Sequence, residues 1–290
     1  MSGTHDHLTS LVPPAELSRR VFVGAAAVTA GYALSMQPVS ATTIVTSGDG
    51  LVAGDVAIPV ADGKIPAYRA YPASGGPFAT VLVIQEVFGL HEWVKDICRR
   101  LAHDGYFAVA ASLNARQGDT TKLTDLHAVM AVISKVPDAE VASDLDATVA
   151  WAATTGKADT ARLGVTGFCW GGRQTWLYAA HNPKVKAAVA WYGPLGYPTD
   201  AIHPKNPPDT IDQLQVPVLG LYGAEDRGIP KSQVEAFAVA LHNAHKETQF
   251  VVFPGAGHGF NADYRPSYNE AAAKEGWKRM LGWFKQHGAA

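Results

Sequence analysis

The sequence predicts a single-domain α/β protein in which helices cover both faces of a mostly parallel sheet. Two patterns carry this prediction. Apolar runs typical of buried strands alternate with segments of helical periodicity, an arrangement that produces parallel sheets. One such run, "ATVLVI" at 79–84, is continuously apolar, as expected of a strand buried on both faces. No repeat, low-complexity tract or interdomain linker interrupts the alternation.

The elements follow in order. Two strands joined by the turn Asp62-Gly63 come first, and a third precedes a helix that begins near Trp93 and stops at Gly105. A further helix begins after the turn at Gly171 and Gly172. The strands are predicted at 52–60, 65–71, 79–84, 106–111, 162–168, 186–191, 216–222 and 248–253. The other helices are predicted at 141–153, 230–243 and 268–286.

The composition limits the class of protein. With 47% hydrophobic residues, the chain can bury a large core. A formal charge of −2 favours neither a nucleic-acid partner nor a membrane-surface partner. Two cysteines cannot build a disulfide framework, so the core must stabilise the fold. We expect a small-molecule substrate and neither a cofactor nor a metal ion.

The N-terminal segment differs from the rest. Arg19 and Arg20 precede the apolar run 21–36, which is too short and too rich in glycine and alanine for a transmembrane span. The small residues at 39–41 suit a signal peptidase, and the segment resembles a twin-arginine export signal. The alternative is an amphipathic N-terminal helix. We expect 1–41 to be a signal peptide read by the twin-arginine translocation machinery, and 42–290 to form a periplasmic or secreted domain.

The stretch "RLGVTGFCWGGRQTW" at 162–176 predicts the candidate nucleophile. A strand leads through Gly167 into a turn, and a helix follows. Such a strand–turn–helix segment usually has the form G-x-S-x-G, with a serine nucleophile at its apex. Here the apex residue is Cys169.

Polar residues at successive strand ends complete a candidate site. Glu86 follows the strand at 79–84, Asp226 follows 216–222, and His258 follows 248–253. Catalytic groups collect at the carboxyl ends of parallel strands. The order nucleophile, acid, histidine matches the α/β-hydrolase fold, which we therefore predict. The alternative is a buried structural Cys169 with an unrelated aspartate and histidine.

The chemistry agrees with a catalytic triad. A thiol needs less help than a hydroxyl to become a nucleophile, since its reference pKa is roughly 8.5. His258 and the positive end of the helix after Trp170 can supply that help. Asp226 would orient the imidazole and stabilise its protonated form. The backbone N–H of Trp170 can donate to the oxyanion of a tetrahedral intermediate.

Five motifs resemble those of the dienelactone hydrolase family, the carboxymethylenebutenolidases, over about residues 52–286. They are "QEVFG" (85–89), "NARQG" (114–118), "GFCWGG" (167–172), "YGAEDRGIP" (222–230) and "GAGHGF" (255–260). The resemblance implies an α/β-hydrolase that cleaves a lactone or activated ester. It implies that Cys169, Asp226 and His258 form the triad.

The resemblance implies roles for other residues. Glu86 would hold the resting thiol and take its proton when substrate enters. Val87 would supply the second oxyanion N–H, and Arg116 would bind a substrate carboxylate. The family carries a second carboxylate-binding arginine shortly after the histidine. Here that position is Ala262, and Arg265 is the nearest arginine. An export signal is a further departure from a family whose pathway is cytoplasmic.

Two other functions fit the sequence. One is a general carboxylesterase or thioesterase, which a panel of neutral p-nitrophenyl esters and carboxylated lactones would distinguish. The other is a thiol redox or sensor protein, with Cys169 peroxidatic and Cys98 resolving. Cys98 lies within a predicted helix beside Ile97, and no C-x-x-C motif is present, which disfavours the redox function.

Overall fold

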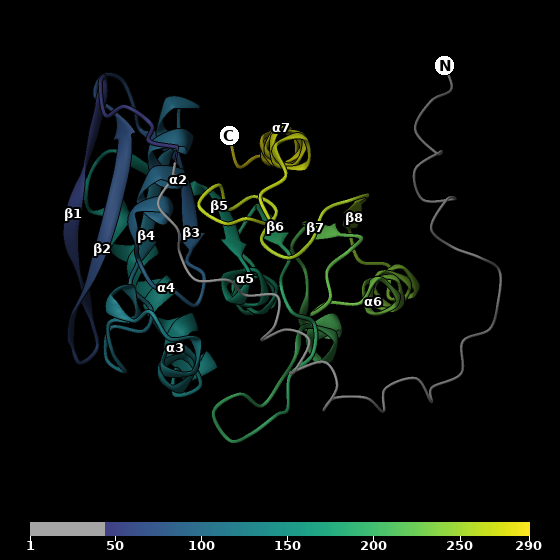
Figure 1. Cartoon of the computed structure of the whole chain (residues 1–290). Coiled ribbons are helices and arrows are strands. Elements are labelled where there is room, and N and C mark those ends of the chain that lie inside the picture. The colour runs from purple at the N-terminus through teal and green to yellow at the C-terminus, as the bar shows by residue number, and fades with distance from the viewer. Residues whose placement is uncertain (1–43) are drawn as a thin grey trace, which may run out of the picture.

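One sheet organises the protein in the computed structural model, which describes residues 44–290 (Figure 1). It has 8 strands in the order β1-β2-β4-β3-β5-β6-β7-β8. β1 and β2 form an antiparallel hairpin beside β4, and β3 to β8 pair in parallel. The predicted α/β-hydrolase architecture is confirmed. The strands are β1 (Leu51–Val60), β2 (Gly63–Pro72), β3 (Phe78–Ile84), β4 (Phe107–Ala111), β5 (Ala158–Phe168), β6 (Ala187–Trp191), β7 (Val218–Gly223) and β8 (Thr248–Phe253).

Helices cover both faces of this sheet. Figure 1 shows α7 and α5 on opposite sides of the central strands. α7 lies next to α2, because Trp277 Nε1 donates a 3.0 Å hydrogen bond to Asp104 at the end of α2. The helices are α2 (Glu92–His103), α3 (Leu126–Ile133), α4 (Asp138–Ala153), α5 (Trp170–His181), α6 (Lys231–Asn243) and α7 (Glu270–Gln286). α3 and two 3₁₀ helices, η1 (Thr120–Lys122) and η2 (Pro207–Gln213), are additions to the elements predicted from the sequence.

The strand register brings the candidate site to one rim of the sheet. Ile84 at the end of β3 is opposite Gly167 of β5, and Phe168 of β5 is opposite Trp191 of β6. Cys169 therefore lies between the ends of two neighbouring strands. Because the strands are parallel, the residues that follow β7 and β8 reach the same rim.

The predicted export segment 1–41, with Arg19 and Arg20, lies outside the described residues. Between residues 44 and 290, the structure has no helix long and apolar enough to cross a membrane.

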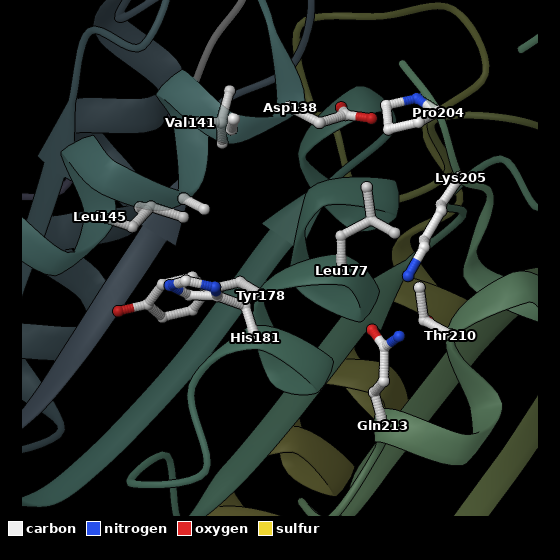
Figure 2. Close-up of a pocket in the computed structure, with 12 residues that line it drawn as sticks. Asp138, Val141, Leu145, Leu177, Tyr178, His181, Pro204, Lys205, Thr210 and Gln213 are labelled. Carbon is white, nitrogen blue, oxygen red and sulfur yellow. The ribbon is translucent and has the colours of Figure 1, made fainter. Parts of the chain in front are cut away.

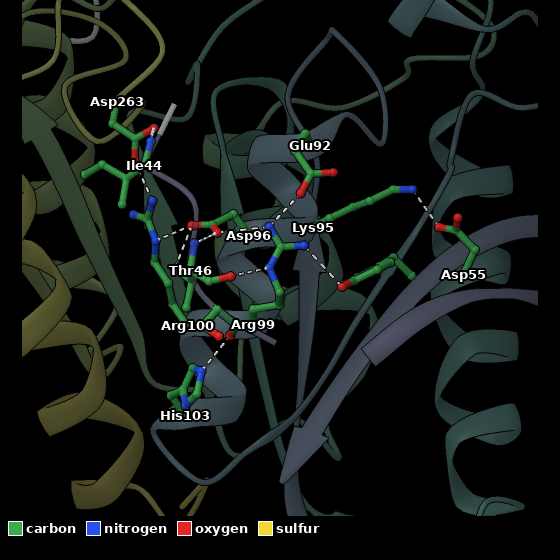
Figure 3. A network of polar contacts seen from close by, with 12 residues as sticks. Ile44, Thr46, Asp55, Glu92, Lys95, Asp96, Arg99, Arg100, His103 and Asp263 are labelled. Carbon is green, nitrogen blue, oxygen red and sulfur yellow. Dashed lines mark hydrogen bonds and ion pairs between the residues drawn. The ribbon is translucent and has the colours of Figure 1, made fainter. Parts of the chain in front are cut away.

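A polar network fixes the start of the described chain to α2 (Figure 3). Asp96 accepts hydrogen bonds from the N–H of Thr46 at 2.6 Å and from its hydroxyl at 3.1 Å. Arg99 Nε donates to the carbonyl of Thr46 at 3.1 Å. Arg100 bridges Asp96, at 2.6 Å, and Asp263, at 2.5 Å. Since Asp263 belongs to the loop between β8 and α7, the network joins three distant parts of the chain.

We expect Asp96→Asn to lower the free energy of unfolding by about 3 kcal/mol, because it removes a buried carboxylate that Arg99 and Arg100 share. The Asp96 side chain is only 1% exposed. Asp55→Asn is the matched control: its carboxylate pairs with Lys95 at 2.6 Å but is 71% exposed. Exposed pairs contribute little, so the control should change stability by less than about 1 kcal/mol. Urea denaturation measures both, and equal losses would contradict the role given to the network.

Candidate active site

Cys169 occupies the sharp turn between β5 and α5. Its backbone has φ 56° and ψ −120°, a conformation that costs energy in a residue other than glycine. Its N–H donates a 3.0 Å hydrogen bond to the carbonyl of Trp191, which ties the turn to β6. A Cβ atom at Gly172 would lie 2.5 Å from that same carbonyl oxygen. The glycine-rich sequence is therefore needed for the close approach of α5 to the strands.

Asp226 and His258 meet beside this turn. His258 Nδ1 lies 2.8 Å from Asp226 Oδ2, and both side chains are fully buried. The other oxygen, Asp226 Oδ1, accepts the backbone N–H groups of Gly228 at 2.9 Å and Ile229 at 3.0 Å. The carboxylate is therefore held in place, and it favours the tautomer with a proton on Nδ1. In that tautomer Nε2 is the basic nitrogen.

The charges around His258 give it a strong affinity for a proton. Burial alone lowers its pKa, but the negative charge of Asp226 and the charge and hydrogen bond of Cys169 raise the pKa to about 10. His91, a half-buried histidine, differs. Burial, aided by the charge of Arg265, lowers the pKa of His91 to about 4 against the opposing effect of Glu86. His258 can thus carry the proton of a thiol, whereas His91 stays neutral.

Backbone donors and a cavity lie next to Cys169. Trp170 is the first residue of α5, where N–H groups have no partner within the helix. Val87 and Trp170 both line a cavity of about 240 Å³. We call it the Val87 cavity; its other walls are Met130, Ile133, Ser134, Arg173, Tyr197, Pro198, Asp200 and His203. The walls are largely apolar, and the one arginine among them, Arg173, is bound by Asp138 at 2.6 and 2.9 Å.

A second cavity, of about 210 Å³, lies between α4, α5 and η2 (Figure 2). Figure 2 shows Val141 and Leu145 on one side, with Thr210 and Gln213 on the other. Asp138 lines this cavity. Because the residues that line it include neither a predicted oxyanion donor nor a residue of the predicted triad, the Val87 cavity is the better candidate for substrate.

Glu86 lies in a buried cluster of charged and aromatic groups. Its Oε2 accepts hydrogen bonds from the Tyr264 hydroxyl and, at 3.0 Å, from Arg265 Nη2. Its Oε1 has no hydrogen-bond partner among residues 44–290. The guanidinium of Arg265 also lies 4.9 Å from the ring centroid of Phe88. The charges of Glu86 and Cys169 both raise the pKa of Arg265, against the effect of its burial, so this arginine belongs to the same electrostatic cluster as the thiol.

Arg116 has a different set of partners. It forms two hydrogen bonds of 2.7 Å with Asp62 in the β1–β2 turn. It also bonds Asp144 of α4 at 2.7 and 3.0 Å, and Glu140 lies 3.4 Å away. The structure thus gives Arg116 carboxylate partners from the protein itself and joins the hairpin to α4 through it.

Sequence reasoning missed three residues of this region. Tyr264 binds Glu86, Arg173 lines the Val87 cavity, and the Tyr192 ring packs 5.2 Å from the His258 ring. Tyr192 directly follows β6, so its place at a strand end was a usable signal. Nothing in the local sequence around Tyr264 or Arg173 indicates their partners.

Cys98 lies at a buried position of α2. Burial raises the pKa of its thiol, and neither it nor Cys169 forms a disulfide in the described part of the chain. A thiol that is rarely ionised reacts slowly, which disfavours Cys98 as a resolving cysteine. Within residues 44–290, no group of three or more His, Cys, Asp or Glu residues is placed to hold a metal ion.

Comparisons with known proteins agree with one another. The model of the "Dienelactone hydrolase family" matches residues 65–288. The chain is 59% identical over 292 residues to the "Putative carboxymethylenebutenolidase" of Methylorubrum extorquens, covering 100% of each chain. A protein of the same name from Escherichia coli K12 is 49% identical, over 89% of this chain and 96% of that one. The solved structure titled "Putative Dienelactone Hydrolase" from Klebsiella pneumoniae has a TM-score of 0.80 and 51% identity, covering 82% of this chain and 100% of its own.

Proposed function

The chain belongs to the dienelactone hydrolase family and is a carboxylic ester hydrolase, and we propose that it cleaves lactones or activated esters with Cys169 as nucleophile. One observation carries this proposal. The thiol lies at the apex of a strained turn, and it hydrogen-bonds to a histidine that is held 2.8 Å from a buried aspartate. Nucleophile, base and orienting acid are the parts that acyl transfer requires.

Acylation begins when Cys169 loses its proton, first to Glu86 as substrate enters and then to His258. The thiolate attacks the carbonyl carbon, and a C–S bond forms. The N–H groups of Trp170 and Val87 donate to the oxyanion of the tetrahedral intermediate. When the intermediate collapses, the C–O bond breaks, and His258 returns the proton to the leaving oxygen. The product is a thioester on Cys169.

Deacylation restores the enzyme. His258 takes a proton from water, which attacks the thioester carbon. The C–S bond breaks, and the proton goes back to the sulfur, so that ester and water yield an acid and an alcohol. Rapid acid quenching during turnover followed by mass spectrometry tests the scheme. We expect the acyl mass on the peptide that contains Cys169; an acyl group on another residue would refute the proposal.

Glu86 is proposed to hold the resting thiol and to take its proton when substrate enters. Its Oε1 is buried and free of protein partners among the described residues, so this oxygen can accept a hydrogen bond. Tyr264 and Arg265 fix the other oxygen and thereby aim the carboxylate. A substrate that binds would displace Glu86 from the sulfur and leave a reactive thiolate. The thiolate would therefore form only when a substrate carbonyl group is bound next to it.

We expect Glu86→Gln to lower kcat by about 10²- to 10⁴-fold, the usual contribution of a general base. The change is nearly isosteric, so folding should be preserved. Glu92→Gln is the matched control, since Glu92 is 59% exposed and pairs with Arg99 at 2.6 Å. Steady-state kinetics measures both. Activity of Glu86→Gln within a few-fold of the parent would mean that His258 alone activates the thiol.

The recognition of a substrate carboxylate is proposed for Arg265. Arg265 lies in the electrostatic cluster of Cys169, and a carboxylate that binds it would compete with Glu86 for the guanidinium. Arg116 remains a candidate from the resemblance, but it would first have to leave Asp62 or Asp144. A turnover screen of lactones with and without a carboxylate tests this proposal.

The apolar Val87 cavity supports a second candidate function, a general carboxylesterase or thioesterase. Its one arginine is already neutralised by Asp138, so the cavity suits an uncharged acyl group. Faster turnover of neutral esters than of carboxylated lactones in the same screen would favour this function.

Export by the twin-arginine route is proposed from the sequence around Arg19 and Arg20. The double variant Arg19→Lys with Arg20→Lys should leave a folded, active enzyme in the cytoplasm. Unchanged periplasmic accumulation of that variant would refute the proposal.

A further inference from the structure

Tyr192 is a strained residue next to the nucleophile. Its φ is 36°, and among the described residues Cys169, Tyr192 and His245 are the non-glycine residues with positive φ. His245 lies in the exposed turn after α6, where such a conformation is common. Cys169 and Tyr192 instead follow neighbouring strands and are fully buried. Strain in a bulky buried residue costs energy, and it is typical of positions at which a side chain must be aimed.

The ring of Tyr192 is held on several sides. It packs edge to face with His258, with centroids 5.2 Å apart, and with Phe260, also at 5.2 Å. Phe168 lies 6.3 Å away on a third side. The backbone N–H of Tyr192 donates a 2.7 Å hydrogen bond to Leu221, which fixes the main chain. The direction of the hydroxyl is therefore set by the fold.

The hydroxyl itself has no hydrogen-bond partner among residues 44–290. A buried hydroxyl without a partner lowers stability, because it has lost its bonds to water. Glu86, Arg265, Tyr264 and Cys169 all lie close enough for their charges to act on it. Burial has the largest effect on the hydroxyl and keeps the pKa of the phenol well above its usual value. The group therefore keeps its proton and remains a hydrogen-bond donor. A buried donor without a partner among residues 44–290 thus lies on a ring that packs against His258, beside the reacting groups.

We propose that the hydroxyl of Tyr192 donates a hydrogen bond to the leaving oxygen of the substrate during acylation. This inference rests on the proposed function, in which Cys169 attacks the ester. His258 must reach the leaving oxygen to protonate it, and Tyr192 packs against His258. The phenol keeps its proton; it stabilises the negative charge that grows on the leaving oxygen as the C–O bond breaks.

The test is Tyr192→Phe, which keeps the ring and removes the hydroxyl. A donor to a charged oxygen contributes about 10- to 100-fold in rate, and we expect that loss in kcat/KM for phenyl and alkyl esters. p-Nitrophenolate leaves without help, so the loss on p-nitrophenyl esters should be only a few-fold. The melting temperature should rise, because a hydroxyl without a partner has been removed.

Tyr222→Phe is the matched control. Tyr222 ends in a buried hydroxyl on the neighbouring strand β7, where it accepts a 3.1 Å hydrogen bond from Trp176 Nε1. Removing this satisfied hydroxyl should lower the melting temperature and leave kcat/KM unchanged for every ester. Both variants remove one hydroxyl group. A rise in melting temperature for Tyr192→Phe and a fall for Tyr222→Phe would show that the Tyr192 hydroxyl lacks a stabilising hydrogen bond in the protein, whereas the Tyr222 hydroxyl has one.

Three results would overturn the inference. They are unchanged kcat/KM of Tyr192→Phe on alkyl esters, an equal loss on all leaving groups, and a fall in melting temperature like that of the control. Failure of the proposed function gives a different result. In that case Cys169→Ala would keep its activity, whatever Tyr192→Phe does.

Discussion

Cys169→Ala is expected to lower kcat by about 10⁵- to 10⁶-fold, the loss observed when a triad nucleophile is removed. No other group in the proposed scheme can form the acyl intermediate. Hydrolysis of phenyl and p-nitrophenyl acetate by purified enzyme measures the loss. Cys169→Ser should keep somewhat more activity than the alanine variant, since a hydroxyl can attack but is far less easily ionised than a thiol.

Cys98→Ala is the matched control for the cysteine. Cys98 is buried in α2, so its replacement should cost stability without changing kcat by more than a few-fold. Activity of Cys169→Ala above about one hundredth of the parent would contradict a covalent mechanism. Loss of activity in both variants would instead indicate that the fold, rather than the nucleophile, had been damaged.

Asp226→Asn is expected to lower kcat by about 10⁴-fold, the effect of the same change in a serine protease triad. The amide can donate to His258 Nδ1, which would stabilise the tautomer that presents a proton to the thiol. It also removes the negative charge that supports a protonated imidazole. Steady-state kinetics between pH 6 and 10 measures the change, and kcat within tenfold of the parent would contradict the role of Asp226.

The same variant should change how stability depends on pH. The pKa of His258 is raised to about 10 in the folded protein, against roughly 6.5 for an unfolded histidine. A raised pKa stabilises the fold fully below pH about 6.5, and this contribution is lost as the pH rises through about 10. The melting temperatures of the parent and Asp226→Asn should therefore differ most near pH 6 and converge toward pH 10.

Glu225→Gln controls for the general effect of removing a carboxylate from this loop. Glu225 is exposed, whereas the Asp226 side chain is fully buried. We expect the Glu225 variant to keep both kcat and the pH dependence of its melting temperature. A difference between parent and Asp226→Asn that stays constant with pH would mean that His258 is not the group linked to stability.

Several parts of the structure followed from local patterns. The continuous apolar run at 79–84 became β3, and the period of Trp93, Val94, Ile97 and Leu101 became the buried face of α2. The strand boundaries were predicted to within a few residues because turns and apolar runs are set by neighbours along the chain. α3 and η2 were not predicted, since α3 is only 8 residues long and η2 is a proline-initiated 3₁₀ segment.

The partners of charged side chains could not be predicted in this way. Arg116 was expected to bind substrate because of its motif, and the structure surrounds it with Asp62, Asp144 and Glu140. Arg265 was expected as the nearest candidate to replace the missing carboxylate-binding arginine, and the structure pairs it with Glu86. These ion pairs join residues that are far apart in the sequence. The hydrophobic periodicity of a segment does not indicate which carboxylate a flexible guanidinium group will bind.

The sequence by itself determined the α/β class, the strand order along the chain, and the three positions 169, 226 and 258 at successive strand ends. Those features depend on backbone geometry and on hydrophobic periods, which are local. Only the tertiary structure decided that Tyr192 packs on His258, that Tyr264 and Arg265 fix Glu86, and that Arg173 is neutralised beside the Val87 cavity. The physical reason is that burial, charge pairing and aromatic contact depend on which distant elements pack together, and packing is settled by the whole core at once.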